Sequence, residues 1–396
     1  MIFARCGQTV SEAKSRVFFS PNVDRDSRES FCDILGFHST PSLGKYLGFP
    51  IRHTGFSSQD FNYILDRVKN KLVGWKANLL SLVGRMVLIQ ASSSAIPTYV
   101  MQCAQLPVRI LDGIDQVNRN FLRGSSKASK KVHWVGWHKV VKSKEEGGLR
   151  LQAAKGRNNS LLAKLNWRFH TEKDTLWSQV LRQKYCNNRR VNASNVNRLP
   201  YSPIWRAMKR GMDTFNKGAM WMIGRDSTLN FWLDSWMVQG PLRHLIQGPL
   251  TREATQLKVR DVLTDAGWQW GLIPFELLLD LKSLIQAILV STVSRGSDKL
   301  AWTGNPRGSF DLKSAYSISM ADDNSPRINL GWVWKIETLT RIKSFIWQCA
   351  HNSVRVKGCL VKRGMGEDNC CPICQVESKS ILHALRDCTT VKAVWV

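Results

Sequence analysis

Acidic residues are scarce in this chain of 396 residues. Its 30 Asp and Glu stand against 57 Lys and Arg, which gives a formal net charge of +27 at pH 7. A chain this basic repels itself unless an anionic partner lies against it, and nucleic acid is the commonest such partner. The composition therefore favours a nucleic-acid-binding protein over one whose basic surface is merely solubilising.

Long apolar runs are also missing. No stretch approaches the roughly 18 consecutive apolar residues that a membrane helix needs. The segment from Met1 to Ser20 has neither the apolar core nor the cleavage site of a secretory signal. We therefore expect an intracellular protein, nuclear rather than cytoplasmic, without a membrane partner. In such a reducing compartment the ten cysteines indicate metal ligands and buried thiols before disulfides.

Patterns of common catalytic sites are absent from the sequence, which shows no catalytic triad, Gly-rich phosphate loop or heptad array. The segment from Met320 to Asp323 reads Met-Ala-Asp-Asp. It follows a predicted helix, and no apolar strand flanks it to hold carboxylates rigidly around metal ions. We therefore predict no catalytic residue and no enzyme activity. The lone histidines are interpreted as ordinary surface or core residues: His38, His53, His170 and His244.

A group of sulfur and imidazole ligands stands near the end of the sequence. Cys371 and Cys374 precede His383 and Cys388, with the spacing C-x2-C-x8-H-x4-C. Two thiolates two residues apart can hold one side of a tetrahedral Zn²⁺, and the later pair can close the other side. These ligand types favour zinc over Mg²⁺ or Ca²⁺, which prefer oxygen. Four protein ligands leave no open position, so we predict a structural zinc ion.

Cys370 leaves one ambiguity, because it could replace Cys371 as a ligand or be a spare thiol. We favour Cys371, since only it gives the two-residue spacer of a zinc knuckle. An apolar helical turn that includes Ile381, Leu382 and Leu385 is expected to carry His383. The alternative is that these cysteines are unrelated.

Apolar periodicity predicts a mainly helical chain. Apolar residues recur at steps of three and four from Phe61 to Trp75, from Leu79 to Gln90, and again after Pro107. These stripes are interpreted as core. Further helices are predicted over 277–288, 313–320, 341–351 and 354–363.

Short strands are predicted between these helices. The segment from Arg16 to Ser20 is one, paired either with 47–51 or with residues upstream of Met1. Others are predicted over 220–224 and 229–232, and a hairpin over 299–303 and 309–311. The predicted fold class is mainly α with small β elements (α+β): a helical region, a mixed α/β region and a zinc-binding module.

Basic residues concentrate in two segments. From Arg119 to Arg157 there are eleven Lys or Arg and only two acids, and from Arg182 to Arg210 there are eight and no acid. Such side chains release counterions from phosphates. We predict that RNA or DNA backbone is bound by Arg119, Arg123, Lys127, Lys130, Lys131, Lys139, Lys142, Arg182, Lys184, Arg189, Arg190, Lys209 and Arg210.

Aromatic residues are interleaved with these basic clusters: Trp134, Trp137, Trp167, Tyr185 and Tyr201. Aromatic rings can stack on unpaired bases. Several of them occur at helical spacing with other apolar residues, so packing in the core is the stronger interpretation for the aromatics.

Several segments resemble a known family. Lys45 to Pro50 (KYLGFP), Gly74 to Ser81 (GWKANLLS) and Leu161 to Arg168 (LLAKLNWR) resemble the part that follows the catalytic palm in plant LINE-type (non-LTR) retrotransposon reverse transcriptases. Phe231 to Trp236 (FWLDSW), Phe310 to Tyr316 (FDLKSAY) and the Cys/His set resemble their zinc-binding domain.

This resemblance implies a piece of an RNA-directed DNA polymerase. The family's catalytic turn, which holds two Mg²⁺, lies just upstream of a sequence like Ser11 to Asn22. The zinc-ligand role carries over to Cys371, Cys374, His383 and Cys388. The implied domains are a remnant of the palm end (1–55), a basic helical thumb and connection (56–215), a tryptophan-rich linker region (216–295) and the reverse-transcriptase zinc-binding domain (296–396).

Two segments depart from the family pattern, Phe121 to Gly124 and Leu149 to Arg150, as in a decaying or domesticated copy. We expect truncation at both ends and no RNase H domain. The leading hypothesis is a non-catalytic fragment that binds RNA or DNA, with a separate palm as a possible partner. The alternatives are a zinc-stapled protein-interaction scaffold and a clipped polymerase.

Overall fold

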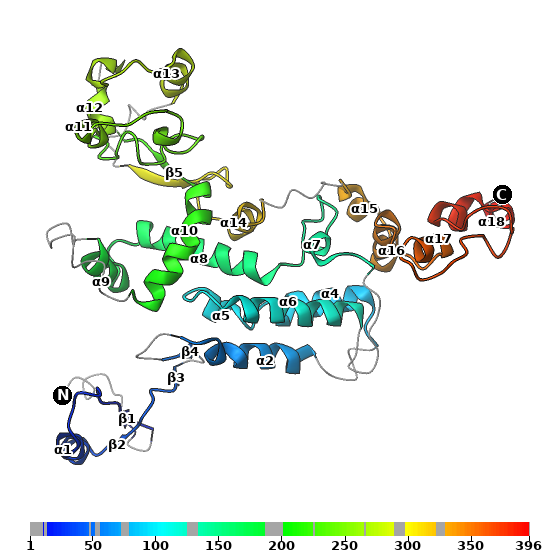
Figure 1. Cartoon of the computed structure of the whole chain (residues 1–396), viewed down its shortest axis with the longest axis horizontal. Helices are drawn as coiled ribbons and strands as arrows, with labels where there is room; N and C mark the ends of the chain where they lie inside the picture. Colours follow the sequence, from blue (N-terminus) through cyan, green and yellow to red (C-terminus); the bar gives the residue numbers. More distant parts are fainter. Residues whose placement is uncertain are drawn as a thin grey trace. The chain divides into compact units, whose positions relative to one another are not determined.

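Two compact units make up the computed structural model, Met1–Phe61 and Asn62–Val396, and we describe each by itself (Figure 1). Helices predominate in both, with a few strands of two to four residues, which confirms the predicted fold class. The structure describes residues 11, 14–46, 49–51, 56–72, 79–124, 134–186, 201–224, 226–264, 267–288, 298–321 and 329–395. The Asp-Asp pair of the Met320 segment lies outside these residues.

The first unit contains one helix and two small sheets. Helix α1 (Arg25–Leu35) begins at Asp24, whose carboxylate accepts a 2.7 Å hydrogen bond from the Ser27 N–H. Strand β1 (Arg16–Val17) pairs in parallel with β2 (His38–Ser39), so the predicted pairing of β1 with 47–51 is wrong. Helix α1 brings the chain back so that β2 lies beside β1. The sequence pattern did not reveal β2 as the partner strand. The remaining elements are β3 (Lys45–Tyr46), β4 (Phe49–Pro50), which pairs with β3 in antiparallel, and η2 (Ser58–Phe61).

The second unit begins with a layer of helices. The three predicted apolar stripes form α2 (Asn62–Leu72), α4 (Leu82–Leu88) and α6 (Val108–Arg123). The stripes of α2 and α6 are largely buried, as predicted, whereas Leu79 and Val87 of the second stripe are exposed, so the core prediction is wrong for these two. The turn η3 (Ile89–Ser93) and the short α5 (Thr98–Met101) connect α4 to α6. Trp75 of the predicted first stripe lies outside the described residues.

A second group of helices carries the basic segments: α7 (Trp137–Val140), α8 (Ala154–Thr171), α9 (Leu176–Tyr185) and α10 (Pro203–Gly218). Helices α8 and α10 pack closely at Gly211, where an added Cβ would lie 2.5 Å from the backbone carbon of Leu162. Glycine is therefore required at this crossing.

The tryptophan-rich part has its own core, built on Phe231, Trp232 and Trp236. Its bounding strands, β5 (Ala219–Met222) and β8 (Lys299–Trp302), pair in antiparallel. The elements between them are η6 (Leu242–His244), α11 (Arg252–Thr255), α12 (Val259–Val262), β6 (Leu263–Thr264), β7 (Gly267–Trp268), η7 (Trp270–Leu272) and α13 (Leu279–Gln286).

Two strand predictions here are wrong. Residues 229–232 form only a single bridge, between Asn230 and Lys258. The Asn230 side-chain oxygen accepts hydrogen bonds from the N–H groups of Trp232 and Leu233, which turns the chain here and ends the strand pairing. Residues 309–311 form no strand with β8: the Trp302 N–H of β8 donates to the Gly308 carbonyl at 2.8 Å, and the pairing does not continue beyond this bond. The Asp311 carboxylate caps the following helix, 2.8 Å from the Ser314 N–H.

The last part is again helical: α14 (Leu312–Ser319), α15 (Gly331–Lys335), α16 (Thr340–Ala350), α17 (Lys357–Val361), η8 (His383–Asp387) and α18 (Thr389–Trp395). The Tyr316 hydroxyl of α14 accepts from the Ala153 N–H at 2.9 Å, which ties α14 to the start of α8. Helix α17 is shorter than the predicted 354–363. Among the described helices, none has both the length and the apolar content to cross a membrane.

Candidate metal centre and basic surfaces

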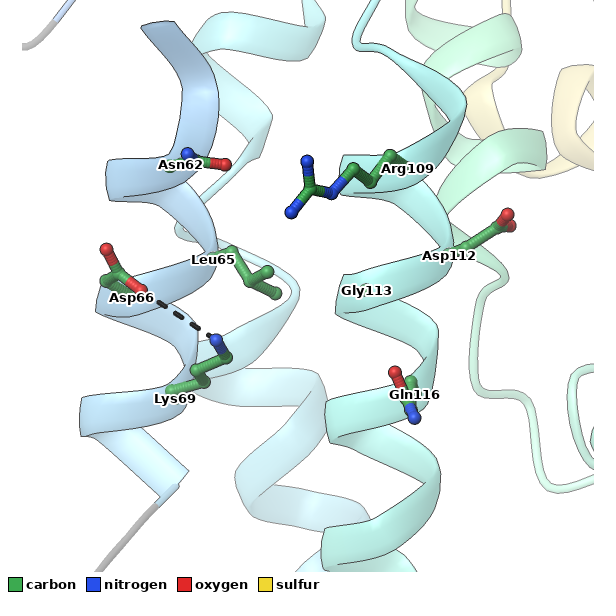
Figure 2. A pocket seen from close by; sticks show the side chains of 8 residues that line it. All are labelled: Asn62, Leu65, Asp66, Lys69, Arg109, Asp112, Gly113 and Gln116. Carbon is green, nitrogen blue, oxygen red and sulfur yellow. Dashed lines mark ion pairs between the residues drawn. The ribbon is translucent and has the colours of Figure 1, made fainter. Parts of the chain in front are cut away.

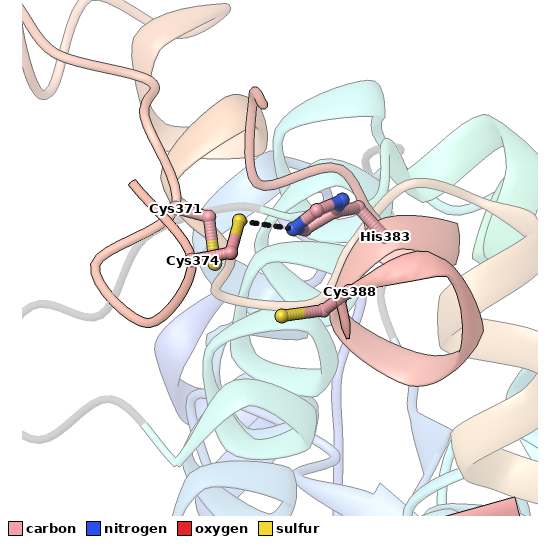
Figure 3. Close-up of side chains that lie close together, drawn as sticks. All are labelled: Cys371, Cys374, His383 and Cys388. Atoms are coloured by element: carbon pink, nitrogen blue, oxygen red, sulfur yellow. Dashed lines mark hydrogen bonds between the residues drawn. The ribbon is translucent and has the colours of Figure 1, made fainter. Parts of the chain in front are cut away.

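Four side chains converge near the end of the chain, and we call them the metal cluster: Cys371, Cys374, His383 and Cys388 (Figure 3). Their ligand atoms all lie within 4.8 Å of one another. Cys371, His383 and Cys388 are buried, whereas Cys374 is partly buried. Three thiols and one imidazole at this separation form a donor set suited to tetrahedral zinc.

A tight loop presents the first two thiols. The Cys371 N–H bonds to the Glu377 carbonyl at 2.8 Å, and the Gln375 N–H bonds to the Cys371 carbonyl at 2.9 Å. Gln375 adopts a positive φ of 53°, which turns the chain sharply. Backbone N–H groups within the loop donate to both sulfurs: that of Cys374 lowers the pKa of Cys371, and that of Glu377 lowers the pKa of Cys374. The loop thus favours the thiolates that bind a metal.

A wide helical turn presents the other two ligands. The Cys388 N–H donates to the His383 carbonyl at 3.0 Å, five residues back, as in a π-helical turn. This turn brings the side chains of His383 and Cys388 to one side. The prediction that an apolar helical turn carries the histidine agrees with the structure, in which Ile381 is buried beneath η8.

Glu377 holds the histidine in place. Its Oε2 lies 3.0 Å from His383 Nδ1, while His383 Nε2 faces the Cys374 sulfur at 3.3 Å. A carboxylate on the second nitrogen fixes ring orientation and tautomer and makes the imidazole a better ligand. Sequence reasoning missed Glu377. An acidic residue between Cys374 and His383, in a chain with few acids, could have indicated a carboxylate that supports the histidine.

Cys370 stays outside the metal cluster. Its backbone N–H bonds to Asp368 Oδ1 at 2.7 Å, and the residue pairs with Ser378 across the loop. Because neighbouring residues of an extended segment point to opposite sides, Cys371 faces the cluster. This arrangement supports the choice of Cys371 that the spacing suggested.

A broad hollow of about 750 Å³ lies between α2 and α6 (Figure 2). Lys69 and Arg109 on its walls are balanced by Asp66 and Asp112, and Lys69 pairs with Asp66 at 3.8 Å. None of the predicted nucleic-acid contacts is among its described lining residues. With its charges balanced, the hollow has no preference for a polyanion.

The predicted contacts of the first basic segment separate into two places. Arg119 and Arg123 line a pocket together with Arg85 and Arg355, two arginines that sequence reasoning did not select. Lys142 lines a different hollow, which also contains the two acids of the segment, Glu145 and Glu146. Lys139 is partly buried in α7. Lys127, Lys130 and Lys131 lie outside the described residues.

The second basic segment forms an exposed surface that we call the α9–α10 basic face: Lys184, Arg206, Lys209 and Arg210. The Lys209 ammonium lies 3.6 Å from the centre of the exposed Tyr201 ring. Arg182 differs, because its guanidinium lies 4.3 Å over the Phe169 ring and donates to the Phe169 carbonyl, so it joins α9 to α8. Arg189 and Arg190 lie outside the described residues.

Most of the interleaved aromatics pack against other rings. Trp167 lies edge-on to the buried Trp302 at 6.2 Å, and Tyr185 stacks on Trp205 at 4.5 Å. The core interpretation therefore holds for Trp167 and Tyr185. The core interpretation also holds for Trp134 and Trp137, which pack against buried residues and in addition line the pocket that contains Arg119 and Arg123.

Comparison with known proteins agrees with this geometry. Residues 310–395 match the family of zinc-binding domains in reverse transcriptases. The chain is 31% identical over 354 residues, 88% of its length, to a putative ribonuclease H protein of Arabidopsis thaliana, and it spans 57% of that protein. It is also 31% identical over 145 residues to an uncharacterized mitochondrial protein of the same plant, of which it covers 94%.

Proposed function

Because the chain belongs to a family of plant retrotransposon-derived proteins with a reverse-transcriptase zinc-binding domain, we propose that it is a non-catalytic module that binds RNA or DNA by its phosphates. The chain spans 57% of the length of the longer relative. A separate palm as partner is part of this proposal. The domain limits at 55, 215 and 295 and the nuclear location belong to this proposal.

The α9–α10 basic face carries the proposal. Helix α10 buries Ala207, Met208 and Gly211 against its neighbours, and its opposite side presents Arg206, Lys209 and Arg210 to solvent. No acid occurs between Arg182 and Arg210 in the sequence. Exposed cations on successive turns of a helix can follow a line of phosphates.

Zinc has a structural role in this proposal. Next to the metal cluster, Val356, Cys359 and Ile381 form only a small cluster of buried residues, because other buried residues of the zinc-binding domain, such as Val333 and Trp347, belong to a core shared with the helical region. A core of this size is too small to stabilise a fold by itself and needs a disulfide, a structural metal or a similar cross-link. Cys371, Cys374, His383 and Cys388 would hold the ion with no open position for a reacting water.

Filter binding to single-stranded RNA at several salt concentrations tests the nucleic-acid part. We expect an affinity that falls steeply with salt. Replacing Lys209 and Arg210 by alanine removes two phosphate contacts, and the slope of log K against log salt should become shallower by about 1.4, at about 0.7 per contact. Arg252→Ala with Arg260→Ala is the matched control, because both arginines are exposed and neither belongs to the α9–α10 basic face. Affinity that does not depend on salt, or no binding at low salt, would refute the proposal.

Primer extension on an RNA template with Mg²⁺ tests the non-catalytic part. We expect no extended product from the chain alone, at any protein concentration at which RNA is bound. Mg²⁺-dependent extension by the purified chain would show that it holds catalytic carboxylates, and a product that appears only after a separate palm is added would identify the palm as partner.

A second function, a zinc-stapled scaffold that binds protein, has one observation in its favour. Apolar side chains are exposed around the metal cluster: Ile373, Val376, Leu382, Val394 and Trp395. Exposed apolar patches often mark protein interfaces. If RNA binding fails, sedimentation of the wild type against Ile373→Ser with Val376→Ser would show whether this surface mediates self-association.

A further inference from the structure

A cavity of about 260 Å³ lies where the helical region meets the zinc-binding module, and we call it the arginine pocket. Arg85 of α4 and Arg119 and Arg123 of α6 come from the helical side, whereas Arg355 follows α16. Arg355 lies inside the segment that matches the zinc-binding family. The pocket therefore exists only when the two parts are packed together.

The arginine pocket concentrates positive charge. Its described lining residues include no Asp or Glu. Burial and the neighbouring Arg119 lower the pKa of Arg123 to about 10, and burial lowers the pKa of Arg85. The Arg123 guanidinium donates to the Val135 carbonyl at 3.4 Å and is disfavoured by the like charge of Arg119, and a bound anion would offset that repulsion. Arginine is also the residue best shaped to hold phosphate through paired hydrogen bonds.

Aliphatic side chains and three tryptophans form most of the remaining walls. Trp134 and Trp137 are partly buried and line the cavity next to the arginines. The Arg363 guanidinium lies 4.8 Å over the Trp134 ring and donates to the Trp134 carbonyl, which fixes this segment against the zinc-binding module. Aromatic walls beside a cationic floor suit a ligand with a flat ring and a phosphate.

We propose that the arginine pocket holds one nucleotide of a bound strand, with its phosphate on the arginines and its unpaired base against the tryptophans. The proposal rests on the nucleic-acid binding proposed above and adds a specific position to it. The volume lies just below the roughly 300–1,000 Å³ of drug-sized sites, so one nucleotide unit fits and a duplex does not. Single-stranded RNA or DNA is the ligand class that this pocket selects.

Photocrosslinking of the zinc-loaded full chain tests the position directly. Single-stranded RNA that contains 4-thiouridine should crosslink to the tryptic peptide that carries Trp134 and Trp137. Crosslinks confined to the α9–α10 basic face would overturn the pocket and leave the proposed function standing. Absence of both crosslinks and salt-dependent RNA binding would overturn the two proposals together.

Affinity measurements test the chemistry. Arg119→Gln with Arg355→Ala should weaken the binding of single-stranded RNA at least about tenfold. Arg341→Ala is the control on surface charge, because Arg341 is an exposed residue of α16 that does not line the pocket. An unchanged thermal melting curve shows that the double variant is folded, and the milder Arg355→Ala alone, at an exposed position, should still weaken binding.

Competition separates a nucleotide from other anions. Uridine 5′-monophosphate, added before irradiation, should lower the yield of the peptide crosslink more than uridine or inorganic phosphate does. Equal competition by inorganic phosphate would overturn the base contact, and equal competition by a poly-glutamate peptide would overturn the nucleotide assignment.

Discussion

The indole N–H of Trp347 donates a 2.8 Å hydrogen bond to the carbonyl oxygen of Gly147, across 200 residues of sequence. His351 Nε2 lies 2.7 Å from the same oxygen. Helix α16 is thereby fastened to the turn at Gly147, which lies between α7 and α8.

We expect Trp347→Phe to lower the free energy of unfolding by about 1 kcal/mol, because one buried hydrogen bond is lost while the ring is largely kept. Urea denaturation at neutral pH measures the change. Trp332→Phe, at a side chain that is 54% exposed, is the control and should be nearly neutral. Equal effects of the two substitutions would contradict the role of the Gly147 contact.

Glu377→Ala should weaken zinc binding about tenfold, at the low end of the usual effect of such carboxylates, because Glu377 is exposed on one side. Competition with a chromogenic chelator gives the affinity. Glu367→Ala removes an exposed carboxylate of the same module that does not touch the histidine. If both variants lose affinity equally, general charge and not the contact with His383 is responsible.

Zinc removal should unfold the last part of the chain. After treatment with a chelator, limited proteolysis should cut within residues 357–395 first, because helix α18 has no buried residue of its own and the metal replaces a core. Cys371→Ser should behave like the chelated protein, and Cys370→Ser should behave like the wild type. Protection of this segment without metal would refute a structural zinc ion.

Gly211→Ala should destabilise the chain by about 1–3 kcal/mol, because the new Cβ would lie 2.5 Å from the backbone of Leu162 and cannot be accommodated by a side-chain rotation. Gly271→Ala is the matched control, since nothing lies within 4 Å of its Cβ position, and it should change stability by less than about 0.5 kcal/mol. Thermal melting compares the two.

Asp115 should make stability depend on pH. Burial raises the pKa of this carboxyl to about 6, although the Ala154 N–H donates to it at 3.0 Å. The folded chain therefore takes up a proton that the unfolded chain releases near pH 4, and the stability contributed by this group is full below pH 4 and lost as the pH rises through 6. The loss is at most about 3 kcal/mol.

Asp115→Asn keeps an oxygen for the Ala154 N–H but does not ionise. Its stability relative to the wild type should rise between pH 4 and pH 7, as measured by urea denaturation at each pH. Asp112→Asn on the same helix is exposed and should follow the wild type. A constant difference between Asp115→Asn and the wild type would show that the pKa of Asp115 is the same in the folded and the unfolded chain.

Local patterns predicted much of this molecule. The apolar stripe of α6, for example, was predicted from side-chain spacing alone, and its residues Ile110, Ile114 and Phe121 are buried. The metal cluster was equally accessible, because its ligands lie close in sequence and their spacing reflects the reach of one ion.

Long-range pairing was not accessible in this way. Strand β1 pairs with His38–Ser39 and β5 with Lys299–Trp302, and strands of two to four residues carry too little alternation to select a partner. The arginine pocket was missed for the same reason, since Arg85 and Arg355 are 270 residues apart in sequence.

The sequence by itself determined a basic, mainly helical chain with a cysteine and histidine set for zinc, because charge, apolar period and ligand spacing are local properties. Only the tertiary structure decided which arginines gather around one cavity, which tryptophans enter the core, and that Glu377 supports His383. Those outcomes depend on how helices cross and loops close, and packing of distant surfaces is not written in any single stretch of residues.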